Sequence, residues 1–226
     1  MNDAQSTCWT MIAAAADGHN EERQRFALRY ADALRAYFAA RWRNSSMSAH
    51  IEDATQVVFM ECLKDGGVLS HATREKHGGF RAFLYGTARN IARRFETGAA
   101  RDRNQQPLDA MPASPPADET TLSIAFDRAW ARQIMKQAAE RMTARATETG
   151  PDALARVDLL RMRFEEGLPI RDIAKRWDRP AELLHREYAR ARKEFKEALL
   201  SVISFNHPDR PQQAREEYAH LLQVLG

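Results

Sequence analysis

Apolar side chains recur every three or four residues along most of this chain, which is the spacing of an amphipathic helix. The alternating runs of β-branched residues that mark strands are absent from the sequence. In the first half of the chain the spacing predicts helices over residues 9–16, 21–42, 51–63 and 80–95. Their expected core stripes are Phe26, Tyr30, Leu34, Tyr37, Phe38 and Trp42, then Ile51, Ala54, Val58 and Cys62, then Phe83, Leu84, Ala88, Ile91 and Phe95.

The helical pattern stops between Thr97 and Thr121. This stretch holds four of the nine prolines and keeps no apolar period, so we expect a flexible, Pro-rich linker. Helical spacing resumes at Leu122 and predicts helices over 122–147, 152–166, 170–177, 181–203 and 212–225. The predicted fold class is all-α, with two small helical domains over 1–97 and 122–205, a linker over 98–121 and a C-terminal helical tail over 206–226.

The tail carries apolar residues at helical spacing, namely Tyr218, Leu221, Leu222 and Leu225. Such a stripe has to be covered by something. The sequence leaves two possibilities for what covers this stripe, a partner protein or the second domain of the same chain. Of the two, folding back on the second domain is favoured.

The charge of the chain is unevenly distributed. The whole chain has a formal net charge of +3, whereas residues 71–104 carry +5 and residues 171–196 carry +4. The remainder is therefore acidic. Two separate basic segments in an otherwise acidic chain indicate two contacts with a polyanion such as DNA, with ordinary solvated helix faces as the alternative.

Composition narrows the class of protein further. With 44% hydrophobic and 29% charged residues the chain has the balance of a globular protein, and no apolar run approaches the roughly 20 residues of a membrane span, so we expect a cytoplasmic protein without a membrane contact. Cys8 and Cys62 show no metal-ligand spacing and are expected to be small, buried or half-buried side chains. Neither a metal nor another cofactor is expected. We find no nucleophile elbow, phosphate-cradling glycine loop or zinc-protease motif, which argues against an enzyme.

Residues 167–188 have the features of a helix-turn-helix. Ala174 supplies a small residue where the second helix would cross the first, and Asp178 stands at the turn, where a left-handed backbone conformation is expected. Pro180 suits the first turn of the following helix, and Leu184 returns an apolar side chain to the core. A surface-charged helical hairpin without DNA binding is the alternative interpretation.

The second helix of this motif has two distinct faces. Leu184, Tyr188, Ala191, Phe195 and Leu199 form its buried stripe. The opposite face is polar and basic, and we expect it to enter the major groove, with its first residues at base edges and its later arginines at phosphates. This face consists of Glu182, His185, Arg186, Ala189, Arg190 and Lys193.

Residues 160–174 (LRMRFEEGLPIRDIA) and 190–193 (RARK) resemble region four of bacterial RNA polymerase sigma factors of the extracytoplasmic-function group. The resemblance implies a domain that binds the minus-thirty-five promoter element, through Arg179, Pro180, Glu182, His185, Arg186, Arg190 and Lys193. It also implies a contact with the flap of a large polymerase subunit, through apolar residues such as Leu159, Met162 and Phe164. The chain departs from the family pattern at the turn, Asp178-Arg179-Pro180, and at Glu187, where a basic residue is common. These departures bear on base preference rather than on fold.

The first domain resembles region two of the same family. Residues 9–18 (WTMIAAAADG) are similar to its opening helix, and residues 51–59 (IEDATQVVF) to its polymerase-binding helix. The resemblance implies docking on the clamp helices of the largest catalytic subunit through Glu52, Asp53, Gln56 and Phe59. Considered alone, Asp53 also fits a helix N-terminal charge that the helix dipole favours.

Residues 80–94 (FRAFLYGTARNIARR) resemble the region-two helix that lies on the minus-ten promoter element. The preceding loop, residues 64–79, would hold a base flipped out of the opened duplex. The resemblance implies minus-ten contacts from His71, Lys76, His77, Arg81, Tyr85, Arg89, Asn90, Arg93 and Arg94. Plain solvent exposure is the alternative for the two histidines.

Together these segments predict an alternative sigma factor whose partners are core RNA polymerase, promoter DNA and an inhibitory anti-sigma protein. The alternative is a stand-alone helix-turn-helix regulator that uses its N-terminal helices for sensing or dimerisation. That alternative leaves the acidic face of residues 51–63 and the basic helix at 80–94 without a purpose.

Overall fold

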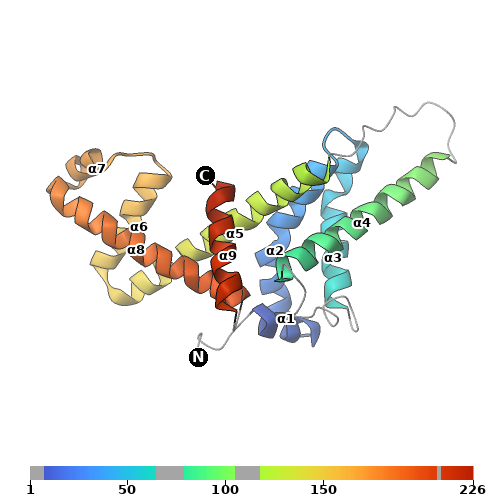
Figure 1. The fold of residues 1–226 in the computed structure, drawn as a ribbon, viewed down its shortest axis with the longest axis horizontal. Helices are drawn as coiled ribbons and strands as arrows, with labels where there is room; N and C mark the ends of the chain where they lie inside the picture. The colour runs from blue at the N-terminus through green and yellow to red at the C-terminus, as the bar shows by residue number, and fades with distance from the viewer. Residues whose placement is uncertain (1–7, 65–78, 105–117, 208–209, 226) are drawn as a thin grey trace. The chain divides into compact units, whose positions relative to one another are not determined.

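The computed structural model describes residues 8–64, 79–104, 118–207 and 210–225, and within these ranges every regular element is a helix (Figure 1). The prediction of an all-α protein is confirmed. The chain forms two compact units. One lies within Met1–Gln133 and Phe205–Gly226, and the other is Ile134–Ser204. No helix of the described ranges combines the length and apolarity that a bilayer span requires.

The first unit is built around α2 (Asn20–Arg41), which contacts α1 (Cys8–Ala16), α3 (Ile51–Leu63) and α4 (Gly79–Asn104). Figure 1 shows these helices in blue to green. A short 3-10 helix, η2 (Ser46–His50), leads into α3. The predicted stripe is confirmed, because all six of its apolar side chains are buried. Four of them are at 0% exposure and among the largest side chains of the core: Phe26, Leu34, Tyr37 and Phe38.

Two further helices complete the first unit, namely the first half of α5 (Glu119–Thr149) and α9 (Pro211–Leu225). Aromatic rings join α5 to the helices before it. The Trp130 ring stacks on Tyr30 with 5.4 Å between centroids, and Phe126 meets Tyr85 edge-on at 5.4 Å. Because large aromatic side chains bury the most apolar area per residue, these contacts anchor the start of α5 to α2 and α4.

The helices on either side of the predicted linker are longer than expected. α4 continues to Asn104, since the nine residues after Phe95 contain no proline and include the helix formers Ala99 and Ala100. α5 begins at Glu119 because Asp118 caps it, accepting a hydrogen bond of 2.8 Å from the Thr121 backbone N–H. The central part of the predicted linker, residues 105–117, lies outside the described residues.

The second unit consists of the second half of α5, α6 (Pro151–Phe164), α7 (Ile170–Trp177) and most of α8 (Ala181–Asn206). Its core cluster comprises Leu159, Met162, Ile170, Ile173, Ala174 and Leu184, with Trp177 and Tyr188 packed against it. Ala174 and Leu184 therefore have the buried positions that the helix-turn-helix pattern predicts. Asp178 ends α7 with φ 50° and ψ 49°, which confirms the left-handed turn.

Candidate nucleic-acid interfaces

The predicted polymerase-binding residues lie on the outer face of α3. Ala54, Thr55, Val58 and Cys62 point into the core and are buried, whereas Glu52, Asp53 and Gln56 are exposed and Phe59 is half-buried. Burial raises the pKa of the Cys62 thiol to about 12, so it stays protonated and unreactive at neutral pH.

Two neighbours of this face were not predicted. Arg35 of α2 donates to both carboxylate oxygens of Glu52, at 2.8 and 3.1 Å, and this hydrogen bonding lowers the pKa of Glu52. Met60 is 68% exposed, and it follows Asp53 by seven residues and Gln56 by four, so it shares their face. That spacing was readable in the sequence, whereas the approach of Arg35 from another helix was not.

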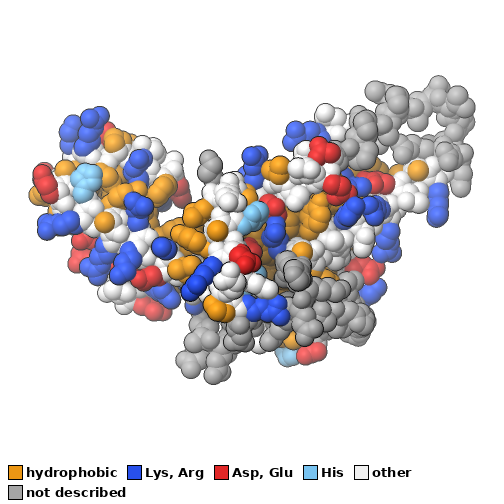
Figure 2. Space-filling view, in the orientation of Figure 1, with side chains coloured by type: hydrophobic (Ala, Val, Ile, Leu, Met, Phe, Trp, Pro, Cys, Tyr) orange, Lys and Arg blue, Asp and Glu red, His pale blue; other side chains and the backbone are white. Residues whose placement is uncertain are grey.

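α4 carries the predicted minus-ten residues on two differently exposed faces. Leu84, Ala88, Ile91 and Ala92 are buried, and the predicted core residues Phe83 and Phe95 are half-buried. The predicted contact residues then divide into a half-buried group, Arg81, Tyr85 and Arg89, and an exposed group, Asn90, Arg93 and Arg94. Figure 2 shows Lys and Arg side chains gathered over this helix and over α7 and α8.

The half-buried group faces acidic side chains of α5. Arg81 forms an ion pair with Asp127, and Arg89 lies with its Nε 3.0 Å from a carboxylate oxygen of Glu119. Tyr85 donates a hydrogen bond of 3.1 Å to the same Glu119. Burial and this hydrogen bond raise the pKa of Tyr85 to about 12. Glu119 and Asp127 were not predicted, and no sequence motif marks them.

The exposed group is open to solvent, apart from one ion pair. Arg94 is 67% exposed, and its Nη1 lies 3.3 Å from Glu61 of α3. The extension of α4 brings in an exposed cation that was not predicted, Arg101, which follows Arg94 by seven residues and therefore lies on the same face. His71, Lys76 and His77 lie outside the described residues.

A buried arginine fixes α4 to α2 behind these faces. The guanidinium of Arg41 is 7% exposed and donates to both oxygens of Glu96, at 2.7 and 3.0 Å, and to the Tyr37 hydroxyl at 3.2 Å. Trp42 donates a third hydrogen bond to Glu96 at 3.0 Å. Burial favours the neutral form of Glu96, but these donors outweigh burial and leave its pKa below the ordinary value.

The second candidate interface is the helix-turn-helix of α7 and α8. All seven predicted minus-thirty-five residues are described, and Arg179, Pro180, Glu182, His185, Arg186, Arg190 and Lys193 are all exposed. Pro180 lies just before α8, and its carbonyl oxygen accepts a hydrogen bond of 3.2 Å from the Leu184 N–H. It therefore occupies the cap position rather than the first helical turn.

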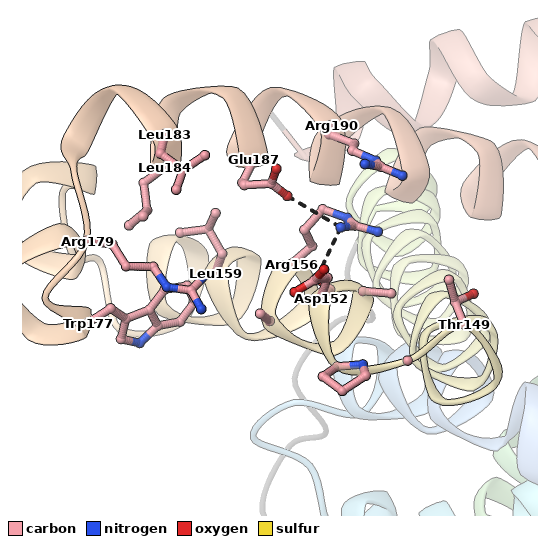
Figure 3. Close-up of a pocket in the computed structure, with 14 residues that line it drawn as sticks. Thr149, Asp152, Arg156, Leu159, Trp177, Arg179, Leu183, Leu184, Glu187 and Arg190 are labelled. Atoms are coloured by element: carbon pink, nitrogen blue, oxygen red, sulfur yellow. Dashed lines mark hydrogen bonds and ion pairs between the residues drawn. The ribbon is translucent and has the colours of Figure 1, made fainter.

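The predicted minus-thirty-five residues fall into two groups. Arg179 and Arg190 line a cleft of about 450 Å³ between α6 and α8, together with Leu183 and Glu187 (Figure 3). Glu182, His185, Arg186 and Lys193 are not part of that lining. The cleft-facing pair is therefore separated from the four residues that form a continuous outward face.

A buried arginine also explains the acidic residue where the family pattern has a basic one. Arg156 of α6 is 4% exposed, donates to Glu194 of α8 at 2.9 Å and lies 3.4 Å from Glu187 (Figure 3). By accepting a hydrogen bond from Arg156, Glu187 helps to join α6 to α8. This acid therefore has a packing role at the base of the cleft. Arg156 was not identified from the sequence, because its partners lie 31 and 38 residues away.

The apolar residues expected to contact the polymerase flap differ in their exposure to solvent. Leu159 and Met162 are buried in the core cluster at 0% and 7% exposure, so they are not available to a partner. Phe164 is 69% exposed. The expectation was wrong for the first two because the helical stripe of α6 that contains them packs on α7 and α8.

Within the described ranges, no three His, Cys, Asp or Glu side chains group as metal ligands would. The arrangement is instead suited to polyanion binding, with cations on two helices and apolar residues behind them. No protein-family model matches this chain, and no curated protein sequence matches it significantly.

Proposed function

We propose that this chain is an alternative sigma factor of the extracytoplasmic-function group, which binds core RNA polymerase and directs promoter recognition, melting and transcription initiation. The observation that carries the proposal is the presence, in one all-helical chain, of two separate cationic helix faces, α4 and α8, with an exposed acid–amide face on α3. A sigma factor needs all three surfaces, whereas a stand-alone regulator needs only the helix-turn-helix.

Each surface has a role in this proposal. Asp53 and Gln56 of α3 dock on the clamp helices of the largest polymerase subunit. α4 binds the minus-ten element, its arginines at phosphates and Asn90 at a base edge, since an Asn amide pairs well with adenine. α8 enters the major groove of the minus-thirty-five element, with Glu182, His185 and Arg186 nearest the bases. The segment between α4 and α5 serves as the interdomain linker, and the protein acts in the cytoplasm.

The test is run-off transcription with purified bacterial core polymerase on a pool of promoters from the source genome. We expect start-site-specific transcripts that require this chain and that disappear with Asp53→Arg plus Gln56→Arg. The matched control is Glu21→Arg plus Gln24→Arg, which changes an exposed acid and an exposed amide three residues apart on α2. Because the charge change and spacing are the same, the control should retain transcription.

Two results would contradict the proposal. Equal loss in both double variants would mean that α3 has no specific docking role. Sequence-specific binding of duplex DNA by the chain alone, with no transcripts in the presence of core polymerase, would favour the stand-alone regulator.

A further inference from the structure

The arginines of α4 and the carboxylates of α5 match in spacing. Arg81 and Arg89 are eight residues apart on α4, and Glu119 and Asp127 are eight residues apart on α5. The pairing is crossed, because Arg81 meets Asp127 and Arg89 meets Glu119. Eight residues span about 12 Å of helix, so two antiparallel helices bring both pairs into register at once.

We infer that the start of α5, held in place by α9, is a built-in mask over the DNA-binding face of α4. This inference rests on the proposed function, since it takes α4 as a DNA-binding helix. A carboxylate is the protein group closest to a phosphate oxygen in charge and hydrogen bonding. Asp127 and Glu119 are therefore paired with the arginine side chains that would bind the phosphates of DNA. DNA has to displace these two carboxylates before it can bind the same arginines.

The mask covers more than charge. The Tyr85 hydroxyl donates to Glu119, and its ring lies edge-on between Tyr37 and Phe126, with 5.3 and 5.4 Å between centroids. A tyrosine held in this way cannot stack on a base until α5 moves away. The Asp127 side chain is 13% exposed and Arg81 27%, so water screens this pair less than a surface ion pair.

α9 also contacts the masking segment. Trp130 of α5 donates a hydrogen bond of 2.9 Å to Glu217 of α9, and His220 of α9 lies 3.4 Å from Asp127. Glu217 is also 3.3 Å from His207, and Leu221 of α9 is 1% exposed. The C-terminal helix is thus packed within the first unit. Asp127, the residue that pairs with Arg81, has a second contact from His220 of α9.

Part of the α4 face stays open. Asn90, Arg93 and Arg94 are exposed, so the masked chain still presents cations to DNA. The inference therefore predicts that α4 binds DNA weakly in the free chain and more strongly once the mask is loosened, rather than an on–off switch.

The test compares two double variants of the full chain that change the net charge equally. Glu119→Gln plus Asp127→Asn removes the masking carboxylates. Glu140→Gln plus Glu148→Gln removes two exposed carboxylates from the later part of the same helix. Binding of a fluorescein-labelled single-stranded oligonucleotide of mixed sequence is measured by anisotropy over a range of salt, without polymerase.

We expect the masking variant to bind at least tenfold tighter than the native chain and the control variant less than threefold tighter. Freeing two cations should also steepen the slope of log affinity against log salt by about 1.4 in the masking variant. Adding Arg81→Ala to the masking variant should remove most of the gain. Circular dichroism and melting of each variant establish that the helices are retained.

Equal gains in both double variants, or a gain that survives Arg81→Ala, would overturn the mask. Run-off transcription with the same proteins separates this result from the fate of the proposed function. Transcription without any gain in DNA binding would refute the mask and leave the sigma factor standing. A gain in DNA binding without transcription would support the mask and count against the sigma factor.

Discussion

The two basic helices of this chain, α4 and α8, resemble each other in composition and differ in what lies opposite their cations. On α4, Arg81 and Arg89 face carboxylates of α5. Asp127 follows Arg81 by 46 residues, and Glu119 follows Arg89 by 30 residues. On α8, Arg186 and Lys193 are exposed, and the acids nearest in sequence, Glu187 and Glu194, are hydrogen bonded to the buried Arg156.

The difference shows how acids can act on a basic surface in opposite ways. Glu119 and Asp127 compete with DNA, because they bind the cations that would meet it. Glu187 and Glu194 are hydrogen bonded to Arg156, and Glu194 also pairs with Arg190 on the cleft side at 3.3 Å. These acids therefore compete less for the outward-facing Arg186 and Lys193. We therefore expect α8 to bind DNA readily in the free chain and α4 to bind it less well than its charge suggests.

The largest effect should come from Arg41→Met, which removes the cation that fixes α4 to α2. Glu96 would lose a bidentate partner at a half-buried site, so we expect a loss of about 3 kcal/mol in the free energy of unfolding. Urea denaturation measures it, and hydrogen exchange should show the loss in α4. The control is Arg25→Met on the same α2, where the arginine side chain pairs with Glu22 but is itself 62% exposed. It should change the free energy of unfolding by no more than about 0.5 kcal/mol. Similar effects in both variants would contradict the assignment.

Arg156→Met should weaken the second unit by about 2 kcal/mol. The loss is smaller than at Arg41 because Glu187 and Glu194, at 32% and 31% exposure, recover part of their hydration. Arg161→Met is the control on the same α6, since its pair with Asp158 is 53% exposed on both sides. A stable Arg156→Met variant with unchanged DNA binding would mean that Arg156 does not set the position of α8.

Asp178→Val should cost about 1–2 kcal/mol, because a β-branched residue fits poorly at φ 50°. Asp178→Gly should stay within about 0.5 kcal/mol of the native chain, since relief of strain and the greater freedom of the unfolded glycine oppose each other. Thermal unfolding and DNA binding of the two variants should fall in the same order. A valine variant as stable as the glycine variant would exclude strain at this turn.

The smallest effect concerns pH and α9. Burial favours protonation of Glu217, but hydrogen bonds from His207 and Trp130 outweigh it and lower its pKa. The folded state therefore gains stability that is present above the ordinary carboxyl pKa and is lost as pH falls through the lowered value. Glu217→Gln should cost about 1 kcal/mol at pH 7, and the cost should shrink as the pH is lowered toward 3, measured by urea denaturation at each pH. A cost that does not change between pH 7 and pH 3 would mean that the charge of Glu217 is not what holds α9.

The helices themselves were largely predictable from the sequence. The bounds expected for 51–63 and 170–177 match α3 and α7. The errors fell at ends set by local chemistry that the apolar pattern does not report. Asp118 caps α5 by bonding to Thr121, and the residues after Phe95 continue α4 with no apolar stripe. The tail does fold back on the predicted second domain of residues 122–205, because α9 contacts Trp130 and Asp127, but the structure places these two residues and α9 in the first unit.

The candidate contact residues were predictable as residue types at helical spacing, but their availability was not. Phe164 and Met162 look equivalent in the apolar pattern, yet one is exposed and the other is buried by α7 and α8. Arg81 and Arg93 look equivalent as basic residues, yet only Arg81 meets an acid from α5. Burial of this kind depends on which helices pack together, and helical spacing carries no information about that.

By itself the sequence determined the all-helical class, the positions of the core stripes, the left-handed turn at Asp178 and the two basic segments. Each of these follows from neighbours within one or two helical turns, where spacing and backbone preference suffice. Only the tertiary structure decided which cations are paired and which are open, because Asp127, Glu119, Glu96 and Glu194 reach their arginines across 30 to 55 residues of chain. Pairs at such separations are set by the packing of whole helices, and that packing decides how much of each basic surface is free to bind.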